Sequence, residues 1–272
     1  MIYSGICASP MGSTHALESA QGKLPLFSFG VISDVQYADI PDGKSFLGIP
    51  RYYRHSFTYF VINFGDIVDG FCPKDQSLNA VRKVVTEFEK FKGPVYHLIG
   101  NHCLYNLPRE KLLRFRIVVL DGYDISAIGW PPDNPNTLQA LLFLRKRTLI
   151  QIRTMEWLDN VLQEAMKLNQ KVIVCCHLPL DPGVSCREAL LWNYDEVLNV
   201  IHQYDCVKAC LSGHDHKGGH SIDSHGVHHR SFEAALECPP GTDAFGYIDV
   251  YDDRLILVGA DRMKSTSMLF HP

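Results

Sequence analysis

The chain has no run of apolar residues approaching the ~18 that a membrane-spanning helix needs. Its first 26 residues lack the apolar core of a secretory signal peptide, and no internal repeat is present. Basic residues do not cluster as binding to a nucleic-acid backbone requires, and the net charge is -4. We therefore expect a cytoplasmic protein whose partners include neither nucleic acid nor a membrane.

Paired CxxC cysteines are also absent. The nine cysteines are odd in number and several lie within apolar runs, which is typical of reduced thiols in a core. They are Cys7, Cys72, Cys103, Cys175, Cys176, Cys186, Cys206, Cys210 and Cys238. This pattern indicates a reducing compartment rather than a disulfide framework.

What the chain does contain is enough apolar sequence for a large core. With 272 residues, 46% of them hydrophobic, it is long enough for one sizeable α/β domain. Residues 1–26 carry scattered Ser, Gly and Pro, and we expect a flexible tail there. Residues 27–272 are expected to form a single domain.

Segments typical of strands and helices alternate along the chain. Apolar runs rich in Val, Ile and Phe predict buried strands at 27–33, 60–64, 95–99, 116–120, 172–176 and 206–211. Apolar stripes at helical spacing predict helices with a core-facing side at 76–91, 155–168 and 190–204. Shorter strands are expected at 227–232, 245–251 and 254–259, and a linker or long loop at 131–135. The pattern predicts an α/β fold, with a mixed sheet or two packed sheets and helices outside.

Five short polar clusters each follow an apolar run. They are Asp34 with Gln36, Asp66 with Asp69, Asn101 with His102, His177, and His214 with His216. Taken singly, each is more often a turn residue, a helix cap or a structural histidine. Ligands bind beyond the carboxyl ends of strands in α/β sheets, so five such clusters are expected to meet in one crevice. Oxygen and nitrogen donors gathered in this way predict a two-metal hydrolytic site.

The order and spelling of these clusters resemble the calcineurin-like metallophosphoesterase superfamily. The usual first motif there is Asp-x-His, whereas this chain has Asp34-Val35-Gln36. Together with four further segments, that spelling resembles the manganese-dependent ADP-ribose/CDP-alcohol diphosphatase family. The segments are Gly65 to Gly70, His177-Leu178-Pro179, Leu191 to Tyr194 and Asp243 to Gly246. The resemblance implies a metallophosphoesterase-like β-sandwich of two mixed sheets flanked by helices.

The resemblance also implies a ligand set for two divalent metal ions. One metal would be held by Asp34, Gln36, Asp66 and His216, and the other by Asp66, Asn101, His177 and His214. Asp66 would bridge the pair. The mixed oxygen and nitrogen donors suit Mn²⁺, although ligand type alone leaves Fe and Zn open. His102 would stay free to stabilise phosphoryl oxygens or to protonate the leaving group.

The implied reaction is hydrolysis of the phosphoanhydride of ADP-ribose or of a CDP-alcohol such as CDP-choline, by a hydroxide that bridges the metals. The products would be a nucleoside monophosphate and a second phosphorylated compound. Aromatic and arginine side chains are candidates for contact with this small-molecule substrate, with core packing or a solvated helix face as the alternative explanation. They are Tyr37, Phe46, Arg51, Tyr53, Arg54 and Phe245. The protein is expected to be a monomer.

Two other functions stay open at this level. A phosphoprotein phosphatase would carry Arg after Asp69, where this chain has Gly70. The connections near residues 57, 114 and 150 are short for the resemblance, which suggests missing segments or a shortened form. A shortened form could be a catalytically silent metal-binding homologue.

Overall fold

The structure is a computed structural model that describes residues 24–37, 61–107, 120, 131, 133–146, 152–239 and 241–271. Four substrate-contact candidates, Phe46, Arg51, Tyr53 and Arg54, lie outside the described residues. The short connections near residues 57, 114 and 150, and residues 1–23 of the expected tail, lie outside them as well.

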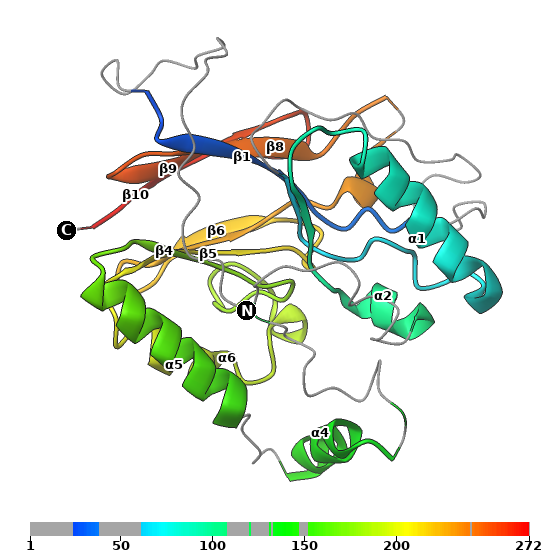
Figure 1. Ribbon diagram of the computed structural model, residues 1–272, viewed down its shortest axis with the longest axis horizontal. Coiled ribbons are helices and arrows are strands. Elements are labelled where there is room, and N and C mark those ends of the chain that lie inside the picture. Colours follow the sequence, from blue (N-terminus) through cyan, green and yellow to red (C-terminus); the bar gives the residue numbers. More distant parts are fainter. Residues whose placement is uncertain are drawn as a thin grey trace.

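Two mixed sheets form the centre of the molecule (Figure 1). The six-stranded sheet has the order β10-β9-β8-β1-β2-β3, in which β1, β2 and β3 run parallel and β8, β9 and β10 are antiparallel to their neighbours. Its strands are β1 (Phe27–Ile32), β2 (Val61–Asn63), β3 (Val95–His97), β8 (Phe245–Val250), β9 (Arg254–Gly259) and β10 (Thr266–Leu269). The predicted pairing of two sheets with helices outside is confirmed.

The second sheet has four strands in the order β4-β5-β7-β6. Its strands are β4 (Val172–Cys175), β5 (Val207–Ser212), β6 (Gly219–Ile222) and β7 (His228–Ser231). Strands β4, β5 and β7 are parallel, and β6 pairs antiparallel with β7. Leu120, at the end of the run predicted as a strand at 116–120, forms a parallel bridge to Cys176.

Helices cover the outer faces of both sheets, so the molecule has four layers. The helices over the six-stranded sheet are α1 (Lys74–Phe88) and α2 (Asn101–Asn106), and those over the four-stranded sheet are α5 (Ile152–Lys167) and α6 (Tyr194–Ile201). Helix α4 (Pro135–Lys146) lies apart from both sheets in Figure 1. One apolar cluster joins α1 and α2 to the six-stranded sheet, and another joins α5 and α6 to the four-stranded sheet. A third cluster, which includes Phe29, Phe64 and Phe232, fills the space between the sheets.

The sequence of β1 shows why it lies at the centre. Phe29 and Val31 point toward the four-stranded sheet, while Ile32 points toward α1. A strand with apolar residues on both faces must be covered on both faces, which matches its burial here.

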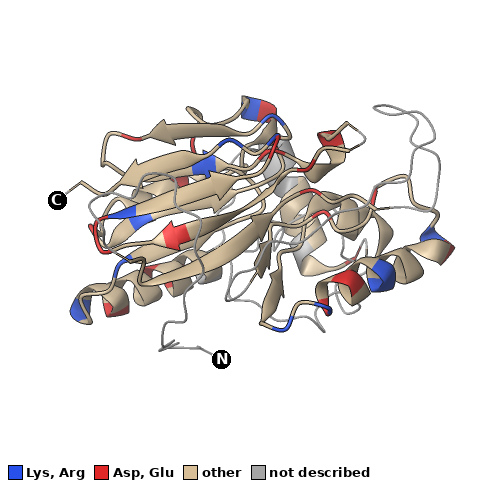
Figure 2. Cartoon of the chain, turned by 90° about the horizontal axis from the view of Figure 1, so that it is seen from above, with Lys and Arg blue, Asp and Glu red and all other residues tan. Residues whose placement is uncertain are grey.

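Most charged residues of the described chain lie at the surface of these layers, and Asp34, Asp66, Arg230 and Glu233 are buried exceptions. Figure 2 shows the described lysines and arginines spread over helices, strands and loops and interspersed with acidic residues. No helix among the described residues is long and apolar enough to cross a membrane.

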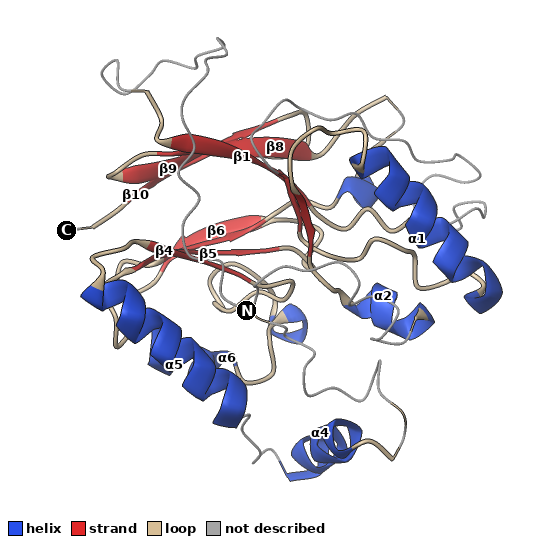
Figure 3. Ribbon diagram, viewed as in Figure 1, coloured by secondary structure: helices blue, strands red, loops and turns tan. Residues whose placement is uncertain are grey.

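Some elements differ from the sequence-based expectations (Figure 3). The helix α4 begins at Pro135, where the sequence indicated only a loop, and the short strands β6 and β10 were not predicted. Leu168 was expected in the core stripe of its helix, but it is 57% exposed because α5 ends at Lys167. The expectation for Leu168 was wrong, whereas Leu158, Leu162 and Ala165 of the same stripe are buried.

A buried arginine connects the four-stranded sheet to the segment before β10. Arg230 of β7 is 1% exposed and pairs with Glu233 at 2.6 Å. Its guanidinium also donates to the Lys264 carbonyl at 3.0 Å and to the Thr266 hydroxyl at 3.1 Å. Because this charge is paired and its donors are used, its burial is tolerated.

We predict that Arg230→Met lowers the free energy of unfolding by about 3–5 kcal/mol, because Glu233 would be left as an unpaired buried charge. Urea unfolding measures the loss. The matched control is Arg254→Ala, which breaks a more exposed pair with Asp253 and is expected to cost under about 1 kcal/mol. Equal losses for the two variants would show that Arg230 does not connect the layers.

Candidate metal centre

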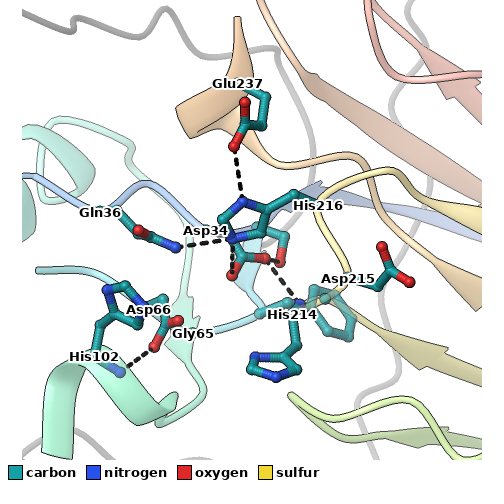
Figure 4. A network of polar contacts seen from close by, with 12 residues as sticks. Asp34, Gln36, Gly65, Asp66, His102, His214, Asp215, His216 and Glu237 are labelled. Atoms are coloured by element: carbon teal, nitrogen blue, oxygen red, sulfur yellow. Dashed lines mark hydrogen bonds and ion pairs between the residues drawn. The ribbon is translucent and has the colours of Figure 1, made fainter. Parts of the chain in front are cut away.

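The five polar clusters come together at the carboxyl ends of β1, β2, β3, β4 and β5, as Figure 4 shows for most of their members. Six non-glycine residues of the described chain have positive φ, and four of these are Asp34, Gln36, Asp66 and His214. Such a backbone costs on the order of 1–3 kcal/mol per residue and persists where surrounding structure holds it. The concentration of strain at these four positions indicates a functional site.

Asp34 follows β1 and is completely buried. Its Oδ2 accepts hydrogen bonds from the Ser33 hydroxyl and, at 3.0 Å, from the backbone amide of His214. Its Oδ1 lies 3.6 Å from His216 Nε2 and accepts no hydrogen bond from the described residues. One carboxylate oxygen of Asp34 is thus held by the protein, and the other faces the centre.

Asp66 follows β2 and has the same division between its two oxygens. Its Oδ1 accepts a hydrogen bond from the backbone amide of His102 at 2.9 Å. Its Oδ2 lies 3.5 Å from His177 Nε2 and, in the described structure, has no hydrogen-bond donor. Two buried carboxylate oxygens therefore point into one small space without a donor to satisfy them.

Imidazole nitrogens complete the second half of the centre. His177 follows β4, and its Nδ1 lies 2.5 Å from the Phe64 carbonyl, an arrangement in which Nδ1–H donates and Nε2 faces Asp66. His214 follows β5, with its ring centroid 5.1 Å from that of His177. The ligand atoms of Asp66, His177 and His214 all lie within 4.8 Å of one another.

His216 and Gln36 lie beside Asp34 in the first half of the centre (Figure 4). The Gln36 amide reaches to 2.9 Å from His216 Nε2. On the other side of the ring, Nδ1 lies 3.0 Å from Glu237 Oε1. A carboxylate on Nδ1 fixes the orientation of the ring and leaves Nε2 facing Asp34 and Gln36, on the side where a cation could be held.

Glu237 has no recognisable signal in the sequence. It lies in the short helix η3 (Ala235–Glu237), outside all the polar clusters. Backbone bonds from Ala235 to Ser33 and from Leu236 to Asp34 place this helix against the end of β1. Only the folded chain therefore reveals that Glu237 orients His216.

Asn101 and His102 form the start of α2. Asn101 is buried, and the neighbouring amide of His102 contacts Asp66. The His102 ring accepts a hydrogen bond at Nδ1 from the backbone amide of Gly70, at 2.8 Å. Because Nδ1 is an acceptor, the proton of the neutral ring is on Nε2, which can donate to a ligand.

Glycine is required where the backbone passes the two carboxylates. A Cβ at position 100 would overlap Asp66 Oδ1, and a Cβ at position 213 would overlap Ser33 Oγ and lie 2.8 Å from Asp34 Oδ2. The glycines of the Gly-Asn-His and Gly-His-Asp-His motifs are therefore needed for close approach to the acids.

The charges of this centre are balanced by protons when no cation is bound. Burial lowers the pKa of His177, but the Asp66 carboxylate outweighs it and raises the value to about 9. Burial also opposes a charge on His216, yet Asp34 and Glu237 raise its pKa to about 9. Burial opposes ionisation of Asp34, but the adjacent His216 ring, with its Nε2 3.6 Å from Oδ1, and the charge of His177 hold the pKa of that carboxyl below its usual range. Positively charged rings of His177 and His216 thus face the carboxylates of the centre.

His214 differs from the other two imidazoles. Burial, followed by the nearby charge of His177, lowers the pKa of His214 to about 4, so the ring is neutral and able to ligate at pH 7. Buried oxygens without donors, together with nitrogens that face them, are a donor set that fits divalent cations. The residues present therefore fit the predicted metals.

Other candidates have different surroundings. Tyr37 and Phe245 both pack against the core cluster that contains Ile32, and Lys83 Nζ lies 5.9 Å above the Tyr37 ring. Their role as substrate contacts stays a prediction, and core packing accounts for both rings. Asp69, the second acid of the Asp66 cluster, accepts the Phe71 amide at its Oδ1 in a turn.

Comparisons with known proteins agree with this arrangement. Residues 27–218 match the family model described as calcineurin-like phosphoesterase. Two relatives, each named manganese-dependent ADP-ribose/CDP-alcohol diphosphatase, match most of the chain. The Arabidopsis thaliana protein is 57% identical, with 89% of this chain and 96% of that protein covered. The Oryza sativa subsp. japonica protein is 52% identical, with 96% and 100% covered.

A solved structure shares the fold. The crystal structure of a dimetal phosphatase from Danio rerio is similar at a TM-score of 0.79 and 28% identity, covering 91% of this chain and 100% of that one. A purple acid phosphatase from yellow lupin, at a TM-score of 0.53 and 11% identity, shares the architecture only.

The chain is shorter than the relatives that it matches. The alignment with the Arabidopsis thaliana protein runs over 300 positions, while 89% of 272 residues is about 242. About 58 aligned positions therefore have no residue of this chain. This difference supports the prediction that segments are missing or shortened, although the connections near residues 57, 114 and 150 are not among the described residues.

We predict that cation binding releases protons from His177 and His216, because both pKa values are about 9. The apparent affinity for Mn²⁺ should rise between about pH 6.5 and 8.5, by up to a hundredfold per pH unit if two protons are displaced. Calorimetry in buffers of different ionisation enthalpy counts the protons.

The same raised pKa values determine whether the stability of the metal-free protein rises or falls with pH. Their contribution to stability is fully present below pH 6.5 and is lost as the pH rises through about 9. The melting temperature without metal should therefore fall over this window, and the gain from Mn²⁺ should grow. His271→Ala is the control, and an affinity that does not change with pH would contradict the assignment.

Proposed function

The chain belongs to the calcineurin-like phosphoesterase family and, within it, to the manganese-dependent ADP-ribose/CDP-alcohol diphosphatases, and from this premise we propose that it hydrolyses the phosphoanhydride bond of ADP-ribose and of CDP-alcohols. The observation that carries the proposal is the pair of buried carboxylates, Asp34 and Asp66, each with one oxygen facing imidazoles and lacking a hydrogen-bond donor in the described structure. Such oxygens are available to cations, and a two-cation centre is suited to phosphoryl transfer.

The two metal ions, proposed to be Mn²⁺, would each have four protein ligands. Asp34, Gln36, Asp66 and His216 would hold one, and Asp66, Asn101, His177 and His214 the other. When bound, the cations supply an activated water and offset the negative charge of the phosphoryl oxygens. The proximity of Asp34 to His216 and of Asp66 to His177 supports this division.

We propose that His102 donates a hydrogen bond to the substrate rather than a proton. The Gly70 amide occupies its Nδ1, so an imidazolium would lose that bond. A phosphate monoester has a second pKa of about 6 and therefore departs at neutral pH without protonation. A donor at Nε2 is sufficient to stabilise a phosphoryl or leaving oxygen.

We also propose a cytoplasmic monomer that acts on a small molecule. The eight cysteines of the described residues are free thiols. Burial raises the pKa of the Cys175 thiol to about 12, which suits an unreactive core thiol.

The direct test is turnover by the 272-residue chain with Mn²⁺. ADP-ribose should yield AMP and ribose 5-phosphate, and CDP-choline should yield CMP and phosphocholine, while a phosphopeptide panel is left intact. Release of phosphate from the peptides alone would favour a protein phosphatase. A folded chain that binds metal but turns over neither nucleotide would be a catalytically silent homologue.

We predict that Asp66→Ala reduces activity and metal content more than Gln36→Ala. Asp66 would bind both cations, whereas Gln36 would bind one. Loss of the Gln36 side chain is expected to lower the affinity for that one cation by about 10–100-fold. Metal analysis and steady-state kinetics check this. Equal effects of the two substitutions would argue against a shared Asp66.

For His102→Ala we expect kcat to fall by about 100–1,000-fold with two metals retained. His102→Gln keeps an N–H donor and should recover part of the loss. Loss of metal in His102→Ala would place the ring among the ligands, and unchanged kcat would remove it from the mechanism.

A further inference from the structure

A second cluster of histidines lies at the far end of the four-stranded sheet. It is built around Asp223, in the turn between β6 and β7, and includes His202, His225 and His229. The other end of this hairpin, at Gly219 and Ser231, is the end near the candidate metal centre, where the Ser231 hydroxyl bonds to the Gly213 carbonyl. The three residue steps of β7 between them span roughly 10 Å. The cluster is therefore separate from the centre described above.

Asp223 is held in one orientation by both of its oxygens. Oδ1 accepts the backbone amides of His225 at 2.9 Å and of Val227 at 3.0 Å. Oδ2 lies 2.9 Å from Nε2 of both His202 and His229. Burial opposes the charge of Asp223, but hydrogen bonds from His229 and His202 outweigh it and lower the pKa of the carboxyl to about 2. An ionised carboxylate thus faces the imidazoles.

The two more accessible histidines adjoin this carboxylate. The rings of His202 and His225 stack with centroids 3.7 Å apart. One ligand atom from each of His202, Asp223 and His225 lies within 4.8 Å of the others. Ligand atoms bound to a tetrahedral cation at about 2.0–2.1 Å lie about 3.3 Å from one another. A small movement of the exposed His225 is therefore enough to bring its ring nitrogen to that distance from the other two ligand atoms.

We propose that His202, Asp223 and His225 form a third metal site, which takes Zn²⁺ or a similar imidazole-binding divalent cation and joins α6 to the β6–β7 hairpin. Two imidazoles and one carboxylate suit zinc, whereas the oxygen-rich donor set favoured by Mn²⁺ is absent from this trio. Three protein ligands leave one position for water.

The surroundings favour a cation at this place. His202 is the residue that follows α6, and its amide bonds to the Leu198 carbonyl, so its ring lies at the negative end of the helix dipole. His229 is buried and donates to Asp223 from the sheet side, which would orient a ligating carboxylate. His225 is exposed and provides an entry path.

Histidines that can serve as matched controls lie on this hairpin and beside it. His220 and His228 stack on each other, and His228 stacks on His271. His228 and His229 are neighbours in β7, so the His228 group lies on the opposite face of the sheet from Asp223. Replacing His271 removes an exposed imidazole from this region without touching the proposed ligands.

The experiment counts Zn²⁺ bound to the full chain after gel filtration, by elemental analysis. We expect His225→Ala to bind one equivalent fewer than the unaltered chain and His271→Ala to bind the same number. Zn²⁺ should also raise the melting temperature of the chain more than that of His225→Ala, because the site joins two elements. Turnover with Mn²⁺ should be the same in all three proteins.

The count is repeated in an Asp66→Ala background, where only the third site is expected to remain. If the proposed catalytic centre did not bind metal, all variants would bind fewer equivalents of Zn²⁺. The difference between His225→Ala and the unaltered chain would stay the same. Equal Zn²⁺ content in His225→Ala and the unaltered chain, in both backgrounds, would show that the Asp223 cluster binds no Zn²⁺ and would overturn the proposal.

Discussion

The structure depends on the burial of two carboxylates, Asp34 and Asp66, at the ends of adjacent parallel strands. An ionised acid removed from water costs several kcal/mol unless it is paired, and one oxygen of each has no hydrogen-bond donor among the described residues. In the metal-free protein, protons on His177 and His216 supply the opposite charge. The same atoms are available to cations when those protons leave. The stability of the fold and the binding of metal are therefore two results of one electrostatic constraint.

This constraint explains the backbone around the site. Asp34 and Asp66 themselves adopt the left-handed backbone conformation just after their strands. A glycine from another strand end lies directly beside each carboxylate. Gly100 lies against Asp66, and Gly213 lies against Asp34, so each carboxylate is enclosed by main chain that leaves no room for a side chain. Local strain is accepted because the packed layers on either side of the strands hold the turns in place. The side chains of the centre are thus positioned by segments that directly follow strands of the two sheets.

The strands and the main helices could be predicted because their apolar periods are set by local burial. Strand β9 was predicted with its observed ends, and α1 differs from prediction by a few residues. The weaker elements were missed because β6 and β10 carry few apolar residues and gain their pairing from neighbours. The centre was predicted as a group because strand ends converge in α/β sheets. The tautomer of His102 could not be predicted, since it depends on the Gly70 amide.

The sequence alone determined the class of donors, their order along the chain and the glycines that accompany them, because these are properties of residue identity and spacing. Only the tertiary structure decided which oxygen of each acid is free and that Glu237 orients His216. It also decided that His202 meets Asp223 across 21 residues of sequence. These contacts join segments far apart in the chain, and their geometry is set by the packing of layers. No local pattern of residues encodes that packing.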